Sequence, residues 1–260
     1  EGFFWYHKIM YPIPRCLWWI FGDFLRQEET PQYSNAFYKL LPDDMIRAPR
    51  FAWLVYWAFA MAAMIPLAPR NNTNPILARK WFHCVAILLF VPATVAAPQL
   101  QSLSYAVALA VLMLIESTRH QVPLLNDFFK NYLDTSKAET DDSTIISHMA
   151  LIAGCGAPLW ILEWWNRPNH PLAPLLSLWG VWSLGLGDAM GAVVGKNLGR
   201  IRWGCQRRTV EGSLAMFLSL VAVCYFADGS VSAWLPAVVL VTFLEAFTTQ
   251  IDNIVLPLAG

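Results

Sequence analysis

The sequence has little charge for its length. Asp, Glu, Lys and Arg make up 14% of the 260 residues, whereas apolar residues make up 57%. A water-soluble domain usually carries roughly 25% charged residues. This shortage excludes an ordinary soluble globule and predicts a chain that lies in a lipid bilayer.

Neither sign of charge is in excess, because 18 Lys and Arg residues balance 18 Asp and Glu residues. A surface that binds nucleic acid needs a net cationic field. We therefore expect no nucleic acid among the partners of this protein.

Cysteines are few and widely spaced. Cys16, Cys84, Cys155, Cys205 and Cys224 stand far apart, and no two of them form a CxxC pair. We interpret all five as buried thiols rather than as disulfides or metal ligands.

Long apolar stretches bounded by charge or proline predict membrane-spanning helices, which need about 20 mostly apolar residues. Seven candidates run approximately over 51–66, 81–98, 100–115, 145–162, 172–187, 213–227 and 232–249, and a last apolar piece covers 251–260. The alternation with a period of two that marks outer-membrane β-strands is absent. We therefore predict an all-α fold, a polytopic transmembrane helical bundle of seven to eight spans.

The first 50 residues differ from the rest, because they mix aromatic stretches with prolines and scattered charges. We interpret 1–50 as a partly interfacial segment. Since the chain begins at Glu1 without the features of a secretory signal, we expect it to be a fragment of a longer membrane region. Residues 51–260 then form one transmembrane domain.

Cationic residues gather in alternate loops. If the spans after residue 66 alternate in direction, loops 66–80, 116–144 and 188–212 share one membrane face and carry 3, 3 and 5 Lys or Arg residues. The opposite loops carry only Arg167, and Arg47 and Arg50 fit this division least well. Because positive loops stay in the cytoplasm, we expect the cationic loops on the cytoplasmic face.

Four glycines recur at every fourth residue, at positions 187, 191, 195 and 199. On a helix they form one stripe without side chains, which another helix or a phosphate-bearing ligand can approach closely. The spacing alone leaves both alternatives open.

Cations, a hydroxyl and a carboxylate follow this stripe at the predicted membrane edge. The group comprises Arg202, Arg207, Arg208, Thr209, Glu211 and Gly212. Such a group suits a polyphosphate with its metal ion, because Arg and Lys neutralise phosphates while a carboxylate such as Asp188 or Glu211 holds Mg²⁺. No P-loop and no dinucleotide-binding glycine motif is present. Simple anchoring of the loop to the membrane surface is the alternative.

The order of these motifs resembles the CTP-dependent polyprenol kinases, and among them the dolichol kinases. The resemblance rests on Gly187-Asp188-Ala189, Gly195, Gly199, Ile201-Arg202-Trp203 and the segment Arg208-Thr209-Val210-Glu211-Gly212-Ser213, and on a second motif from Phe243 to Leu258. Weaker similarities lie at 79–83, 116–120 and 142–148. The chain departs from the family at 204–208, where Arg207 and Arg208 replace a lysine pair and no Pro-Gly is found.

The resemblance implies a transmembrane catalytic domain over 51–260 that transfers the γ-phosphoryl group of CTP to the hydroxyl of dolichol or a related polyprenol. The product, dolichyl phosphate, carries sugars for protein glycosylation at the endoplasmic reticulum membrane. The reaction uses Mg²⁺, and the active site faces the cytoplasm. The oligomeric state stays open.

The resemblance also suggests roles for individual residues. We expect Asp188 and Glu211 to hold the metal ion, and Glu245 or Asp252 to orient or deprotonate the alcohol. The expected nucleotide-binding residues are Gly187, Gly191, Gly195, Lys196, Gly199, Arg207, Arg208, Thr209 and Gly212. Further candidates are Arg79, Lys80, His83, Glu116, Arg119, His148 and Asn253.

Glu245 and Asp252 share a helical face if the helix that carries them is continuous. A carboxylate inside a membrane is costly and usually marks a functional site or a charged partner. A structural alternative for Glu245 is an ion pair that locks two helices together.

Other functions fit parts of the pattern. A phytol or farnesol kinase, or a cytidylyltransferase, would also use CTP, and the released product separates kinase from transferase because only the transferase releases pyrophosphate. A transporter or a non-catalytic helical scaffold would use the glycines for helix packing and would turn over no nucleotide.

The predicted topology makes one direct prediction about Asn71-Asn72-Thr73, which has the pattern of a glycosylation site. Since loop 66–80 is expected on the cytoplasmic face, we expect Asn71 to carry no glycan. Mass spectrometry with and without glycosidase checks this, and a glycosidase-sensitive mass that maps to Asn71 would reverse the orientation.

Overall fold

The computed structural model describes residues 24–25, 41–67, 75–118, 121–122, 146–165, 173–204, 208–228, 231–247 and 252–259, most of which are helical. The helices with bounds are α3 (Asp43–Ile46), α4 (Arg50–Leu67), α5 (Pro75–Ala96), α6 (Pro98–Thr118), α8 (Ile146–Trp164), α9 (Ala173–Val181), η4 (Trp182–Asp188), α10 (Ala189–Asn197), α11 (Val210–Asp228), α12 (Val231–Phe247) and α13 (Asp252–Leu258). Each of the seven predicted spans coincides with helix. The all-α fold is therefore confirmed over these ranges.

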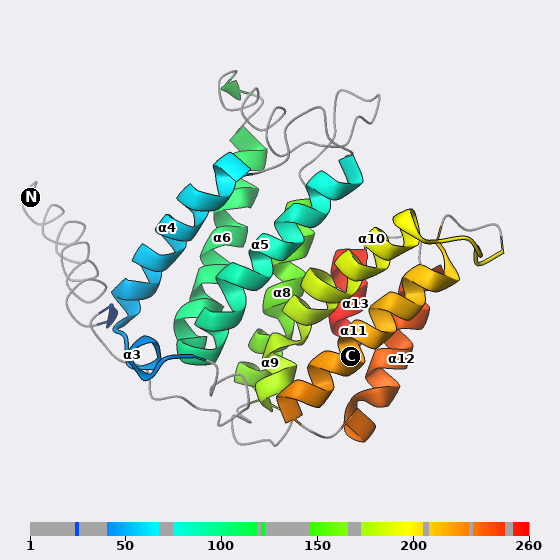
Figure 1. Cartoon of the computed structure of the whole chain (residues 1–260). Coiled ribbons are helices and arrows are strands. Elements are labelled where there is room, and N and C mark those ends of the chain that lie inside the picture. The colour runs from blue at the N-terminus through cyan, green and yellow to red at the C-terminus, as the bar shows by residue number, and fades with distance from the viewer. Residues whose placement is uncertain are drawn as a thin grey trace, which may run out of the picture.

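The long helices pack side by side and alternate in direction (Figure 1). The C-terminal ends of α4, α6 and α10 lie toward the top of Figure 1, together with the N-terminal ends of α5, α8 and α11. The segments that carry most of the predicted site therefore meet at one end of the bundle.

Two helices are long and apolar enough to cross a membrane, over Pro98–Thr118 and Val210–Ala227, and four shorter helices are also apolar. Only 22% and 39% of an apolar 18-residue window in these two helices is buried. Large apolar side chains such as Leu114 and Phe226 point outward instead. Outward apolar faces suit lipid rather than water, so the chain is a membrane helical bundle. The count of seven to eight spans stays a prediction.

One helix runs further than the sequence indicated. The predicted span 172–187 was to be followed by a loop, whereas α9, η4 and α10 form one helix that continues to Asn197. Its middle, Trp182–Asp188, is a π-helix, a wider turn that often occurs at functional sites. The residues after 188 that were assigned to the loop therefore begin on a helix, because 189–197 contains no proline and only one charge.

Helix α4 is attached to α5 through a break in the hydrogen bonding of α5. Pro92 lies inside α5 and has no N–H, so the carbonyl of Leu88 lacks its helical donor. The hydroxyl of Tyr56 donates to Leu88 O at 2.5 Å, and the indole of Trp57 donates to Leu89 O at 3.0 Å. The freed carbonyl is thus satisfied by the neighbouring helix, as membrane interiors require.

Arg50 is the first residue of α4 and does not belong to the cationic loops. Its side chain is buried, and the guanidinium donates to Gln99 Oε1 at 2.8 Å and to Phe24 O at 3.2 Å. Arg50 therefore ties α4 to the start of α6, which explains why it did not fit the division of charge between loops.

The interpretation of the cysteines is correct in part. Cys155 and Cys224 are buried and form no disulfide, but Cys84 is exposed, so burial was wrong there. Cys84 lies on α5, an apolar helix, so its exposed side chain suits contact with lipid. Cys16 and Cys205 lie outside the described residues, as does most of 1–50.

Helices α8, α9 and α13 meet at backbone contact. A Cβ atom on Gly180 of α9 would overlap Gly154 O of α8, and one on Gly154 would overlap Asn253 O of α13. Only glycine permits this approach. These contacts hold α9, and with it η4, directly against α8.

We expect Gly180→Ala to lower the melting temperature of the detergent-solubilised protein by several degrees, since the new methyl group has no space. Gly191→Ala is the matched control on the same continuous helix. Its Cβ would lie 3.4 Å from the nearest atom, Gly212 O, which is ordinary contact. Equal melting temperatures for the two variants would contradict the packing described.

Candidate functional site

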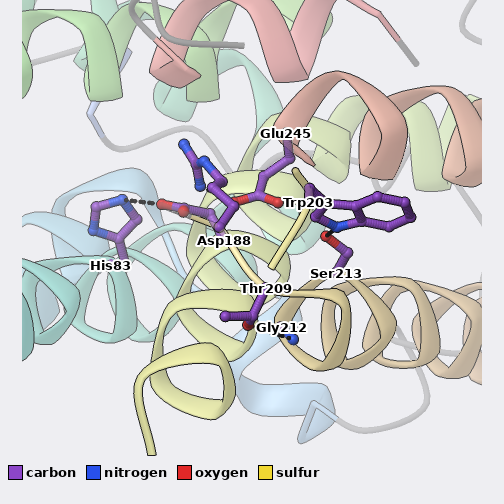
Figure 2. A network of polar contacts seen from close by, with 8 residues as sticks. His83, Asp188, Trp203, Thr209, Gly212, Ser213 and Glu245 are labelled. Carbon is purple, nitrogen blue, oxygen red and sulfur yellow. Dashed lines mark hydrogen bonds and ion pairs between the residues drawn. The ribbon is translucent and has the colours of Figure 1, made fainter. Parts of the chain in front are cut away.

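Three of the predicted site residues are charged or titratable and buried in the bundle. His83, Asp188 and Glu245 have exposed fractions of 7%, 3% and 3%. Figure 2 shows them in one close-up with Trp203 and Thr209, from the segment between α10 and α11, and with Ser213 of α11. Burial of such groups without partners is costly, so their contacts define the candidate site.

Asp188 lies against His83. The distance from Asp188 Oδ2 to His83 Nε2 is 3.2 Å, and Figure 2 shows the carboxylate turned toward the imidazole. Asp188 ends the π-helix, and Gly185 one turn before it lets α5 approach, since a Cβ there would lie 2.6 Å from Ile87 Cγ1. Asn197, the last residue of α10, is nine positions after Asp188, so the pair lies about 13 Å below the end of that helix.

Glu245 on α12 forms an ion pair with Arg208, through Glu245 Oε1 and the Arg208 Nη1 atom. The carboxylate side chain is 5% exposed, whereas the arginine side chain is 27% exposed. Arg208 lies two residues before α11, and Glu245 lies two residues before the end of α12. The pair therefore joins the start of α11 to the end of α12. Glu245 therefore has the cationic partner that the structural alternative requires, although Arg208 lies just before α11 and not on a helix.

A short hairpin before α11 carries Arg208 to this position. Arg202 and Thr209 form an antiparallel bridge, and the Trp203 N–H donates to Arg208 O at 3.1 Å. Gly204 has a φ of 54°, a left-handed conformation that glycine adopts freely. The backbone of Arg208 is therefore fixed from the opposite strand of the hairpin.

The indole of Trp203 anchors the hairpin to the bundle. Its Nε1 donates to Ser213 Oγ at 3.0 Å, and its ring centroid lies 5.4 Å from that of Phe247. These contacts connect the hairpin with α11 and with the last residue of α12. The sequence interpretation gave Trp203 and Ser213 no role; an aromatic residue inside a cationic loop was the available signal.

Glu211 faces the backbone of the hairpin. Its Oε1 atom accepts the N–H groups of Arg200 and Ile201 at 3.0 and 3.1 Å. Thr209 Oγ1 accepts the Gly212 N–H at 3.2 Å and thereby caps the start of α11. In this arrangement Glu211 and Thr209 hold the hairpin on α11.

The glycine stripe of the long helix packs against α11. A Cβ on Gly212 would lie 2.7 Å from Gly191 O and 3.1 Å from the Gly195 Cα atom. Deeper in the bundle, a Cβ on Gly187 would lie 3.3 Å from the side chain of Leu220. Of the two alternatives, the structure shows close helix packing. Nucleotide contact at these glycines stays a prediction.

The remaining candidates are spread around the bundle. Lys196 is exposed in the last turn of α10, Glu116 is half-buried near the end of α6, and Asn253 is half-buried on α13. The continuous helix on which Glu245 and Asp252 were to share a face is not found, because α12 ends at Phe247 and α13 begins at Asp252. The side chains of Arg79, Lys80, His148 and Asp252 lie outside what the structure describes, as do the whole residues Arg119 and Arg207.

Among the side chains that the structure describes, no three His, Cys, Asp or Glu residues gather as a ready metal cage. Mg²⁺ bound to a nucleotide needs only one or two protein carboxylates, since phosphates and water supply its other ligands. The buried Asp188 carboxylate fits this requirement. Glu211 already accepts the backbone N–H groups of Arg200 and Ile201, which leaves fewer of its oxygen lone pairs for a metal ion.

Known proteins with similar sequences agree in their description. A dolichol kinase from Arabidopsis thaliana is 32% identical over 80% of this chain and 39% of its own length. The human dolichol kinase is 28% identical over 98% of the chain and 48% of its own length, and the Saccharomyces cerevisiae dolichol kinase is 27% identical over 78% and 40%. Over most of its length the chain is thus similar to dolichol kinases, which supports a member of that family.

The chain thus spans less than half the length of these curated relatives. No protein-family profile matches it, and no solved structure matches it.

The role of Glu211 in holding the hairpin can be tested by hydrogen exchange. We expect Glu211→Ala to speed the exchange of the Arg200 and Ile201 amides roughly tenfold, because both lose a charged acceptor. Glu163→Ala at the other end of the bundle, where Glu163 accepts from Ser102 Oγ, is the control. Unchanged exchange at 200–201 would show that Glu211 does not hold the hairpin.

Proposed function

We propose that this chain carries the catalytic region of a dolichol kinase that transfers the γ-phosphoryl group of CTP to the terminal hydroxyl of dolichol. The observation that carries the proposal is the similarity to dolichol kinases of a plant, a mammal and a yeast, which extends over most of the chain. Residues that form the two buried pairs and the hairpin belong to the motifs of the resemblance.

The physical demands of the reaction fit a site at the end of a membrane bundle. Dolichol cannot leave the bilayer, whereas CTP is soluble, so the two substrates meet only at the interface. The exposed cations Lys196, Arg200 and Arg202 lie at this end of the bundle, where α10 ends. We propose that it is the cytoplasmic face of the endoplasmic reticulum membrane, because cationic loops stay in the cytoplasm.

Phosphoryl transfer needs mainly in-line positioning and neutralisation of charge. We propose that Asp188 holds Mg²⁺ and that His83 holds the Asp188 carboxylate in place through their contact. Bound Mg²⁺ would neutralise charge on the phosphate oxygens. Arg208, with Arg207 and Lys196, contacts the phosphates, and we reassign Glu211 from the metal ion to the hairpin because its carboxylate accepts backbone N–H groups.

The reaction is tested with the full-length protein in lipid, supplied with Mg²⁺, γ-labelled CTP and dolichol. We expect the label to enter the lipid from CTP and not from ATP, to prefer dolichol over phytol, and to leave CDP rather than pyrophosphate. A folded sample that labels no isoprenoid alcohol would defeat the proposal.

The role of Asp188 is tested by Asp188→Asn, which keeps the shape of the side chain and removes its charge. We expect kinase activity to fall roughly 100-fold or more at unchanged protein level, because a charge that acts on the transferring phosphoryl group is lost. Asp44→Asn on α3, where Asp44 is exposed, serves as the matched control and should keep its activity. Full activity of Asp188→Asn would remove Asp188 from the site.

A further inference from the structure

The ion pair between Glu245 and Arg208 is open on one side only. The carboxylate side chain is 5% exposed, and the guanidinium side chain is 27% exposed. A ligand that arrives from the water phase therefore meets the arginine first. Such a one-sided pair suggests that the carboxylate acts through the arginine.

We infer that Glu245 is a positioning residue, which holds the guanidinium of Arg208 so that its open side binds the phosphates of the nucleotide. The inference rests on the proposed function and deepens it. It replaces the expectation that Glu245 itself takes the proton of the alcohol.

The chemistry of the guanidinium allows both contacts at once. Arginine has five N–H donors in a planar fork, and one carboxylate engages at most two of them. The Arg208 side chain is 27% exposed, so the exposed part of the fork can bind a phosphate oxygen while Glu245 stays in contact. A lysine, with one compact ammonium group, offers no such fork.

Burial of Glu245 favours this double contact over an exchange of partners. If a phosphate drew Arg208 away, the carboxylate would be left uncompensated in an apolar interior, which is strongly unfavourable. The pair therefore stays formed when the phosphate binds, and the arginine is shared.

The hairpin fixes the backbone of Arg208, just as Glu245 holds its guanidinium. Arg208 O accepts the Trp203 N–H, and the Trp203 ring packs on Phe247, two residues from Glu245 on α12. Both the backbone and the guanidinium of Arg208 are thus held before the nucleotide arrives. Such preorganisation strengthens binding because less freedom is lost on association.

A double-mutant cycle in the full-length protein tests the inference, with Glu245→Gln, Arg208→Lys and the double variant. Arg208→Lys is chosen because it keeps a cation beside the buried carboxylate. We expect Glu245→Gln to raise KM for CTP roughly tenfold, to leave KM for dolichol unchanged and to change kcat less than threefold. The double variant should match Arg208→Lys alone, because Glu245 acts only through the arginine fork.

Binding provides a readout apart from catalysis. CDP should raise the melting temperature of the wild type more than that of Glu245→Gln. Glu163→Gln is the matched control, since this glutamate lies at the other end of the bundle and accepts a hydrogen bond from Ser102. It should keep the wild-type KM and the wild-type response to CDP.

Three results would overturn the inference. A loss of kcat in Glu245→Gln with unchanged KM for CTP, and a further loss in the double variant, would identify Glu245 as the proton acceptor. Wild-type KM and CDP response in Glu245→Gln would leave it a purely structural ion pair. A wild type that transfers no label would defeat the proposed function and the inference with it, whereas the first two results leave the function intact.

Discussion

A carboxylate inside an apolar bundle depends on a cation or another polar partner from a different helix, and this constraint organises the structure. Asp188 meets His83 of α5, and Glu245 of α12 meets Arg208 before α11. Each contact joins segments that are far apart in the sequence. Because an unpaired buried charge is strongly unfavourable, these pairs fix which helices lie together at one end of the bundle.

Close backbone approach makes such pairing possible. Without a side chain at Gly185, α5 comes near enough for His83 to reach Asp188, and without one at Gly212 the long helix and α11 touch through their backbones. The hairpin between these helices is then held by Trp203 and Glu211, which bond to α11 and to the hairpin backbone. Packing and polar contacts thus act together, since glycine positions decide which side chains can meet.

The fold could be read from the sequence to a large extent, because helix formation in a membrane depends on local composition. Apolar runs over 81–98 and 213–227 gave helices at those places, and the motif around Asp188 gave the family. The helix end at Asn197 was missed because the charge of Asp188 ends the apolar run, whereas the helix continues past this residue. The exposure of Cys84 was missed because an apolar run does not tell which face of a helix meets lipid.

The sequence by itself determined the helical class, the membrane environment and the resemblance to polyprenol kinases, since these follow from composition and from the order of residues along the chain. Only the tertiary structure decided that the glycine stripe is covered by α11, that Glu211 bonds the hairpin backbone, and that Glu245 is shared with Arg208. The reason is physical. A residue's type fixes what it can bind, but its actual partner comes from another helix, and the approach of two helices is set by packing across the whole bundle.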